Sequence, residues 1–473
     1  MSWHDFKSYS LALIILLVVT VPHLEQGDYS RDTGRYAAVG LYMFDGGDPL
    51  APHLNPETPY FNKPPLALVI HGIFLKIFGA HVAVARIPSV LAALSVVLLS
   101  MLSLRQIGSR SEAVVSGVVL ALSYEFSRRT REISLDFWQL FFVMFAVYFV
   151  LRSAKEDSPW RLLLAGVFIG LGLLCKPLVA LGTIPVFAAW LVTSRRATLL
   201  PWLFLGTLPV AVLVAAPWHI YMYCKFGHAF LAQYFGNQIL DRALGLQLNQ
   251  PFIYYFKLIA QTYWPWLIVL ACAFYRRGWK YVPGREMRRD TFLFAAIWVA
   301  VILLGISCFP DKKPNYALPL YPMMSWLVAW GLCRIKWVKL RKWYRRDFPW
   351  FKISFAALGI ALSVAPVQLQ PPADPNWKSI LHWFSDRHVP PDQVVYYKLS
   401  ANDVCYYYLQ TGNWPRDIQE LPDAKKNASV SNLFVIARSA QISEDLDQAT
   451  LLKAGKLAIL PGNAKFDVLS SAP

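Results

Sequence analysis

The chain has 473 residues, of which 56% are hydrophobic and only 16% are charged, and its mean hydropathy is +0.38. Soluble domains are usually about 45–50% apolar and about 25% charged, so this composition excludes an ordinary water-soluble protein. The net charge of +17 does not indicate nucleic-acid binding, because the densest basic clusters, 276–289 and 334–346, lie between apolar runs. Cytoplasmic loops of membrane proteins retain Lys and Arg in this way.

The apolar runs predict an all-α membrane protein that crosses the bilayer many times. The first run follows Lys7 but has no small-residue cleavage site after it, so it is interpreted as an uncleaved first helix. The candidate spans are 8–24, 82–104, 112–127, 134–151, 160–175, 178–193, 199–223, 252–275, 291–308, 316–333 and 351–368. They predict about eleven or more transmembrane helices.

Segment 64–79 is ambiguous, because it is apolar but short, opens with two prolines and contains His71 and Lys76. It could be a twelfth span or a helix in the membrane interface. If it does not cross, the more basic loops collect on one side, which the positive-inside rule makes cytoplasmic. We therefore expect a peripheral or re-entrant element, a cytoplasmic N-terminus and an outward-facing first loop, 25–81.

The composition becomes more polar near the C-terminal end. Residues 374–473 contain short apolar runs that are typical of strands, such as 394–397 and 433–436. The sequence therefore predicts two domains, a transmembrane domain over 1–370 and a small α/β domain outside the cytoplasm over 371–473. No catalytic pattern is recognisable in the second domain.

Ionisable residues gather in the first outer loop. Asp32 lies three residues before Arg35, so both side chains point the same way on a helical turn, and a carboxylate beside a guanidinium suits a general base next to a bound phosphate. The alternative is a surface ion pair. Lys63 lies between aromatic residues and a proline corner that would hold it for a phosphate, although an interfacial lysine is equally compatible with this pattern.

Three later segments place charges at the outer ends of helices. Residues 128–136 form a cationic loop that ends on Asp136, residues 170–177 form a glycine-rich helix end that closes on Lys176, and residues 311–322 carry two lysines followed by prolines. Ionisable residues at membrane depth indicate function by default. The alternatives are headgroup contacts for the arginines and helix packing for the glycines. Six cysteines and nine histidines show no metal-ligand spacing, so no metal site is predicted.

In their order along the chain, these segments resemble C-type glycosyltransferases, which use polyprenyl-phosphate-linked sugars. The likeness is to the bacterial lipid A aminoarabinose transferases and the protein O-mannosyltransferases, and it covers about residues 10–335. It rests on Asp-x-x-Arg-Tyr-Ala from Asp32, Tyr-Phe-x-Lys-Pro from Tyr60, Gly-Leu-x-x-Lys-Pro ending at Pro177 and Lys-x-x-Tyr-x-Leu-Pro-x-x-Pro from Lys313. Further matching pieces are Phe78-Gly79, Val84-Ala85-Arg86, an Asp at the start of a helix (Asp136) and Gln250-Pro251-Phe252-x-Tyr254-Tyr255.

The resemblance implies roles for individual residues. Asp32 corresponds to the catalytic base and Asp136 to the second acid. The residues assigned to the donor phosphate are Arg35, Lys63, Arg128, Arg131, Lys176 and Lys313, and those assigned to the substrate are Tyr36, Tyr60, Asn62 and Tyr316. The aminoarabinose transferases typically carry a metal-binding Glu where this chain has Asn62, so a divalent cation is doubtful and no cofactor is assigned.

These expectations combine into inverting transfer of a sugar from a polyprenyl-phosphate carrier to an envelope acceptor, with lipid A or a related glycolipid favoured. The enzyme would act as a monomer at the outer face of the bacterial inner membrane, with its C-terminal domain in the periplasm. One alternative is a transporter or flippase of a lipid-linked or anionic solute, but the inverted hydropathy repeat of many transporters is not evident. Another is a polymerase or ligase of surface glycan.

Overall fold

The computed structural model describes residues 3–27, 29, 31–244, 250–275, 286–333, 381, 384–386, 388, 394–397, 401–417, 434–438, 456–460 and 467–469. Contacts divide the chain into two compact units. Unit 1 comprises Met1–Leu24, Phe61–Ile70 and Arg86–Val367, and unit 2 comprises Glu25–Tyr60, His71–Ala85 and Gln368–Pro473. The candidate span 351–368 and most of the basic clusters 276–289 and 334–346 fall outside the described residues.

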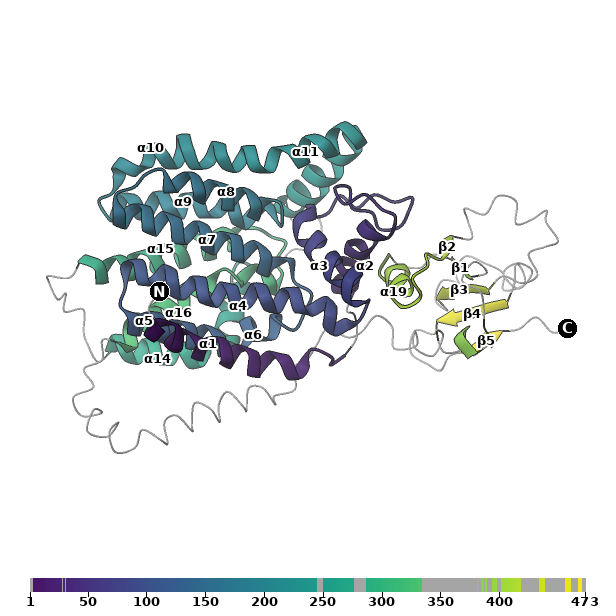
Figure 1. Cartoon of the computed structure of the whole chain (residues 1–473), viewed down its shortest axis with the longest axis horizontal. Helices are drawn as coiled ribbons and strands as arrows, with labels where there is room; N and C mark the ends of the chain where they lie inside the picture. The colour runs from purple at the N-terminus through teal and green to yellow at the C-terminus, as the bar shows by residue number, and fades with distance from the viewer. Residues whose placement is uncertain are drawn as a thin grey trace, which may run out of the picture. The chain divides into compact units, whose positions relative to one another are not determined.

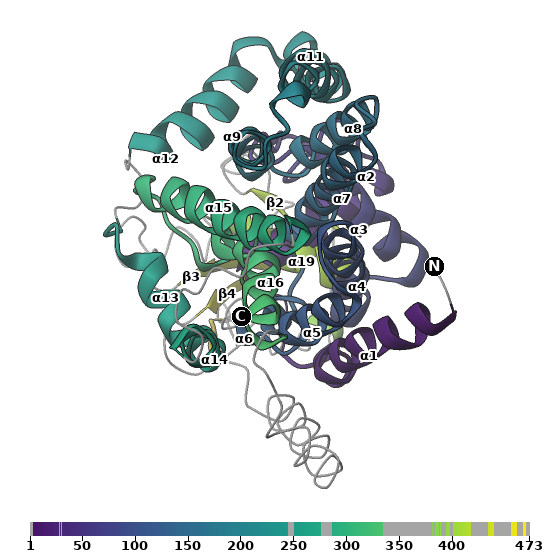
Figure 2. The same cartoon turned by 90° about the vertical axis from the view of Figure 1, so that its left-hand side faces the viewer.

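Unit 1 is a bundle of helices whose long members run nearly parallel in Figure 1 and are seen close to end-on in Figure 2. Its α-helices are α1 (Trp3–Thr20), α4 (Val82–Ile107), α5 (Arg110–Ala121), α6 (Tyr124–Arg129), α7 (Leu135–Glu156), α8 (Arg161–Leu173), α9 (Pro177–Thr193), α10 (Leu200–Trp202), α11 (Leu208–Leu231), α12 (Asp241–Leu244), α13 (Tyr254–Thr262), α14 (Trp264–Tyr275), α15 (Glu286–Cys308) and α16 (Leu320–Leu332). Shorter 3-10 or π segments are η1 (Val21–His23), η2 (Ala197–Leu199), η3 (Leu203–Thr207), η4 (Ala232–Leu240) and η5 (Pro314–Ala317).

The packing of unit 1 follows from small residues and stacked rings. Helix α8 contacts α7 and α11. A Cβ at Gly170 of α8 would come within 2.6 Å of the Val214 side chain and 2.8 Å of the Ala211 carbonyl oxygen on α11, so only glycine permits this approach. On the other side, Phe145 and Phe168 stack at 4.5 Å between α7 and α8. The packing interpretation of the glycine-rich segment is thus confirmed for Gly170.

Among the described residues, four helices are long and apolar enough to cross a membrane, namely Val82–Ile107, Leu135–Glu156, Ala197–Asn237 and Arg289–Cys308. Large apolar side chains such as Leu213 and Ile220 are exposed on α11, as lipid-facing positions require. The expected single span 252–275 is instead two helices, α13 and α14, bent by 86°. Pro265 lies in the first turn of α14, where it cannot continue the hydrogen bonding of the preceding helix. Counting this pair as one span raises the number to five, and the total of eleven stays a prediction.

Unit 2 begins with the first outer loop. Helix α2 (Arg31–Asp45) and the end of α3 (Pro65–Phe78) lie in this unit with α19 (Ala401–Thr411), which contacts α2. Gly72 of α3 approaches the backbone of α2, because a Cβ there would lie 2.0 Å from the Gly40 carbonyl oxygen. Helix α3 spans 14 residues, or about 21 Å, which is shorter than the roughly 30 Å hydrocarbon core. Whether this segment crosses the membrane stays a prediction.

The C-terminal strands of unit 2 form one sheet in the order β2-β1-β3-β4-β5. Strands β1 (Val394–Tyr397), β2 (Arg416–Asp417), β3 (Phe434–Arg438) and β4 (Lys456–Leu460) are parallel, and β5 (Asp467–Leu469) pairs with β4 in the antiparallel sense. The expected domain boundary near residue 370 differs from the grouping by contacts, which places 25–60 and 71–85 with the C-terminal region. The domain division and the extracytoplasmic α/β domain stay predictions.

Candidate active site

The Asp136 carboxylate, at the start of α7, is held at both oxygens. The Lys176 ammonium lies 2.6 Å from Oδ1, and the Asn315 amide donates to Oδ2 at 2.8 Å. The side chains of Asp136 and Lys176 are each 14% exposed. Three segments that are far apart in the sequence thus meet at one carboxylate, which we call the Asp136 cluster (Asp136, Lys176, Asn315).

Local structure holds Lys176 in this position. Lys176 precedes Pro177, the first residue of α9, and has the extended backbone that proline imposes on its neighbour. Gln139 of α7 donates to the Lys176 carbonyl. The ammonium also lies 4.5 Å from the centre of the Tyr316 ring, which gives it a cation–π partner. Tyr316 therefore adjoins the cluster, as a substrate-side residue would.

Asn315 is a residue that sequence reasoning did not assign to the site, although it lies between the assigned Lys313 and Tyr316. Its neighbourhood is fixed by the backbone of the same motif. The Lys313 carbonyl accepts from the Tyr255 hydroxyl at 3.2 Å, and the buried Lys312 donates to the Gln250 carbonyl at 2.9 Å. The motifs at Gln250 and Lys313 are therefore neighbours in space.

Lys63 lies in a second polar segment of unit 1. Its side chain is 8% exposed, and its ammonium donates to the Asn62 carbonyl at 2.9 Å. The backbone N–H of Leu66 donates to the Leu174 carbonyl at 3.1 Å. This bond places the Lys-Pro corner at Lys63 next to the Lys-Pro corner at Lys176. The two corners are separated by more than a hundred positions in the sequence, and the fold brings them together.

Asn62 bears on metal binding. Its side-chain oxygen accepts from the Gln233 amide at 3.2 Å, so it is a neutral oxygen already engaged in a hydrogen bond. Divalent cations prefer carboxylates, and within the described ranges no group of three or more His, Cys, Asp or Glu side chains is placed to hold an ion. The donors at this point do not fit a metal ion, and no chemical step is assigned to one.

In the cationic loop 128–136, glutamate carboxylates neutralise the charges of two arginines, which the sequence analysis did not predict. Arg128 forms ion pairs with Glu125 at 3.0 Å and with Glu132 at 3.2 Å, and Arg129 pairs with the same two carboxylates at 2.8 and 2.9 Å. The assignment of Arg128 to the donor phosphate stays a prediction, although two carboxylates already occupy its guanidinium.

Arg131 differs from its neighbours because it is buried without a carboxylate among the described contacts. Its side chain is 1% exposed, and its Nη2 donates to the Val19 carbonyl at 2.7 Å. Its Nε and Nη1 have no hydrogen-bond partner in the described part of the chain. Burial lowers the pKa of Arg131 to about 10. A buried charge without a counter-ion is costly, and a bound anion would compensate it.

The remaining assigned residues lie in unit 2. Asp32 is in the first turn of α2, and Arg35 follows one turn later, as the spacing predicted. The Arg35 guanidinium donates from Nε and Nη2 to the side-chain oxygen of Asn402 at 3.1 and 2.6 Å. Tyr36 is half-buried and Tyr60 is buried. Sequence reasoning missed Asn402, because nothing in its local sequence marks it.

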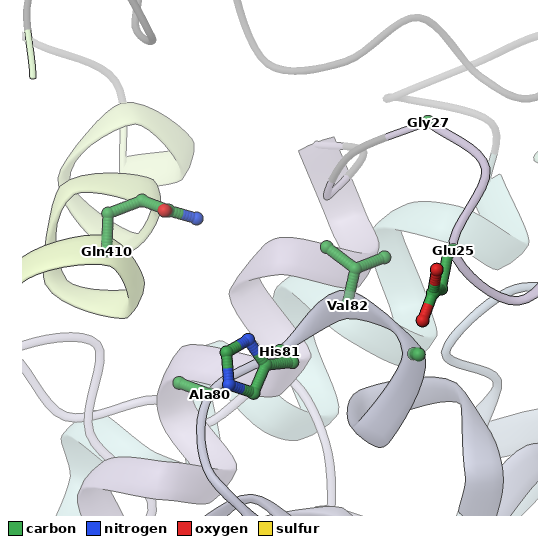
Figure 3. Close-up of a pocket in the computed structure, with 7 residues that line it drawn as sticks. Glu25, Gly27, Ala80, His81, Val82 and Gln410 are labelled. Carbon is green, nitrogen blue, oxygen red and sulfur yellow. The ribbon is translucent and has the colours of Figure 1, made fainter. Parts of the chain in front are cut away.

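Unit 2 also contains a cavity of about 330 Å³. Its polar lining side chains are Glu25, His81 and Gln410, which Figure 3 shows on three different segments. None of the residues assigned from the sequence lines this cavity.

Known proteins are similar to this chain over the segments that carry the candidate site. The family model described as dolichyl-phosphate-mannose-protein mannosyltransferase matches residues 62–221, a stretch that includes Asn62, Lys63, Asp136 and Lys176. A crystal structure of ArnT from Cupriavidus metallidurans bound to undecaprenyl phosphate has a TM-score of 0.71 at 16% identity, over 96% of this chain and 92% of that one. An oligosaccharyltransferase of Archaeoglobus fulgidus, in complex with zinc and sulfate, has a TM-score of 0.51 at 14% identity, over 91% of this chain and 60% of that one. These structures show the fold.

These similarities agree with the class predicted from the sequence, the C-type glycosyltransferases, and the solved structures show that the chain shares their fold. Among individual relatives, the undecaprenyl phosphate-alpha-4-amino-4-deoxy-L-arabinose arabinosyl transferase of Pectobacterium carotovorum is 26% identical over 77% of this chain and 67% of its own length. The protein of the same name from Pseudomonas paraeruginosa is 27% identical over 69% of this chain and 60% of its own length.

Proposed function

We propose that the protein transfers a sugar from a polyprenyl-phosphate carrier to an envelope acceptor, with lipid A or a related glycolipid favoured, on the outer face of the inner membrane. The observation that carries the proposal is the Asp136 cluster beside the Lys63 corner. Asp136, Lys176 and Lys63 lie within the residues matched by the mannosyltransferase family model, and Asn315 lies beyond them. Relatives named as undecaprenyl phosphate-alpha-4-amino-4-deoxy-L-arabinose arabinosyl transferases support the polyprenyl-phosphate donor.

The proposed reaction inverts the anomeric centre. Asp32 takes the proton of the acceptor as the acceptor oxygen bonds to the anomeric carbon, and the bond between that carbon and the carrier phosphate oxygen breaks. The polyprenyl phosphate leaves with both electrons of that bond. Lys63, Lys176 and Arg35 stabilise the negative charge that gathers on the phosphate, and such electrostatic stabilisation is usually the largest contribution to catalysis.

The Asp136 cluster has a separate part in this proposal. An ammonium paired with a carboxylate is held in a fixed place, and Asn315 and Tyr316 restrict it further. A positioned cation needs little reorganisation as charge develops, which is the condition for effective electrostatic catalysis. Asp136 thus serves as the second acid of the site by fixing Lys176. The residues that contact the substrate in this proposal are Tyr36, Tyr60, Asn62 and Tyr316.

The test is transfer by the purified protein in nanodiscs that contain radiolabelled polyprenyl-phosphate sugars and a panel of acceptors. We expect label to move to a lipid acceptor, and we expect Asp32→Asn and Lys63→Ala each to lower the rate by about 10²–10⁴-fold. Arg152→Ala is the control, because Arg152 pairs with Glu156 at the far end of α7 and is 39% exposed.

Three results would contradict the proposal. Full transfer by either well-expressed site variant would remove the assigned roles. Label that crosses the bilayer without changing carrier would support the transporter instead, whereas label that accumulates in a growing glycan would indicate a polymerase or ligase.

A further inference from the structure

Arg35 is held by a residue from the other end of the chain. Its Nε and Nη2 both donate to the same oxygen, Oδ1 of Asn402, at 3.1 and 2.6 Å. Asn402 lies in the first turn of α19 and is half-buried. The two residues are 367 positions apart and belong to the same compact unit.

Helix α19 is attached to α2 and to the chain just before it by aromatic contacts. Before α2 begins, the Tyr29 ring contacts the Tyr406 ring edge to face at 6.5 Å. Near the end of α2, Tyr42 contacts Tyr408 in the same way at 6.1 Å. Because these contacts lie before α2 and near its end, α19 presents Asn402 to Arg35 as part of a fixed surface rather than a loose loop.

One hydrogen bond joins the two helices independently of Arg35. The Tyr408 hydroxyl donates to Asp45 Oδ2 at 2.8 Å, at the last residue of α2. Burial, with the nearby Asp45 carboxylate, raises the pKa of Tyr408, so this hydroxyl keeps its proton and remains a donor at neutral pH. The bond provides a matched control for contacts that only hold α19 in place.

The chemistry of the Arg35 contact favours a role beyond attachment. A guanidinium has five N–H donors in a planar fork, and Asn402 engages the edge formed by Nε and Nη2. The third nitrogen, Nη1, takes no part in these two bonds. It is the donor that can meet a phosphate oxygen. Because the partner is a neutral amide, the orientation of Arg35 is fixed while its positive charge is retained. A carboxylate at the same place would neutralise that charge and compete with phosphate.

We infer that Asn402 is a positioning residue that orients Arg35 toward the phosphate of the polyprenyl-phosphate donor. The C-terminal region then contributes to donor binding through Asn402 of α19, which acts on Arg35. This inference rests on the proposed function, in which Arg35 binds that phosphate.

The experiment compares Asn402→Ala, Asn402→Asp and Tyr408→Phe in the full-length protein in nanodiscs. Affinity for polyprenyl phosphate and the KM and kcat of transfer are measured for each. Loss of hydrogen bonds to a charged group predicts that Asn402→Ala raises the Kd and the donor KM about tenfold, with a smaller effect on kcat. Asn402→Asp keeps the hydrogen bonds and adds a charge, so it is expected to weaken donor binding at least as much, and most strongly at low salt.

Tyr408→Phe separates positioning from attachment. It removes a hydrogen bond between α2 and α19 without touching Arg35, so we expect less than about a twofold change in donor KM. If Asn402 only attaches α19, Asn402→Asp would restore the wild-type KM, or Asn402→Ala would resemble Tyr408→Phe. Either result would overturn the inference.

The binding measurement also separates this inference from the proposed function. If the wild-type protein transfers no sugar, the proposed function fails, and the Kd for polyprenyl phosphate still reports on Asn402. If Arg35→Ala binds polyprenyl phosphate as tightly as the wild type does, Arg35 is not a phosphate ligand and the role of Asn402 is refuted, whatever the transfer assay shows.

Discussion

Replacing Lys176 by methionine keeps much of the side-chain volume but removes the cation that pairs with Asp136. Both side chains are 14% exposed, and the Lys176 ammonium lies 2.6 Å from the carboxylate. Removing one partner of a buried pair leaves an uncompensated charge, which costs about 3–5 kcal/mol. Asn315 still donates to the other carboxylate oxygen, so we expect Lys176→Met to lose about 3 kcal/mol of unfolding free energy, at the lower end of that range.

The chain provides a matched control in Lys76 and Asp45. Their charged atoms are also 2.6 Å apart, but the Lys76 side chain is 52% exposed and that of Asp45 is 28% exposed. Exposed pairs contribute about 0–1 kcal/mol, so Lys76→Met is expected to cost less than about 1 kcal/mol. The two substitutions differ mainly in burial, because the separation of the charges is the same.

The assay is a denaturant titration of each variant in mixed micelles, in which unfolding is monitored by tryptophan fluorescence. The double variant Lys176→Met/Asp136→Asn removes both charges and should recover more than about 1 kcal/mol relative to the sum of the single variants. Equal costs for Lys176→Met and Lys76→Met, or additivity of the double variant within about 0.5 kcal/mol, would show that burial does not control the energy of the Asp136 cluster.

Three further predictions concern catalysis, metal dependence and stability. Asp32→Asn should lower the rate of transfer far more than the affinity for polyprenyl phosphate if Asp32 is the base, and an unchanged rate would exclude that role. Transfer should continue at an unchanged rate after treatment with EDTA, because Asn62 is neutral and bound to Gln233; loss that is restored by Mg²⁺ or Mn²⁺ would contradict this. Arg131→Met should leave the unfolding free energy unchanged or raise it and should lower transfer, because two nitrogens of the buried Arg131 side chain have no hydrogen-bond partner among the described residues. A large loss of stability would show that the buried cation is needed for the fold.

Much of the site could be predicted from local patterns. Asp32 and Arg35 occupy successive turns of α2, and helical periodicity predicts that arrangement without any tertiary contact. Pro64, Pro65 and Pro177 mark the corners that hold Lys63 and Lys176, because proline restricts the backbone wherever it occurs. The glycine at position 170 indicated close helix packing for a similarly local reason.

Other features could not be predicted, because they depend on which segments meet. Some runs of continuous apolar sequence do not form one regular α-helix. One run is broken between α13 and α14, and another contains the π segments η3 and η4. Hydropathy is averaged over such a run, so it does not show where the helix bends or changes its hydrogen bonding. By contrast, the ion pairs of Arg128 and Arg129 with Glu125 and Glu132 join residues three or four positions apart, so helical spacing alone could have indicated them.

The sequence by itself determined the membrane class of the protein, its resemblance to glycosyltransferases and the charged residues proposed for the site, because composition, periodicity and ordered motifs are local properties. Only the tertiary structure decided the partners of those charges. Asn315 reaches Asp136 across 179 positions and Asn402 reaches Arg35 across 367. A neutral amide carries no charge pattern and no periodicity that would single it out, so its part in orienting a charged residue becomes visible only when folding brings the two side chains into contact.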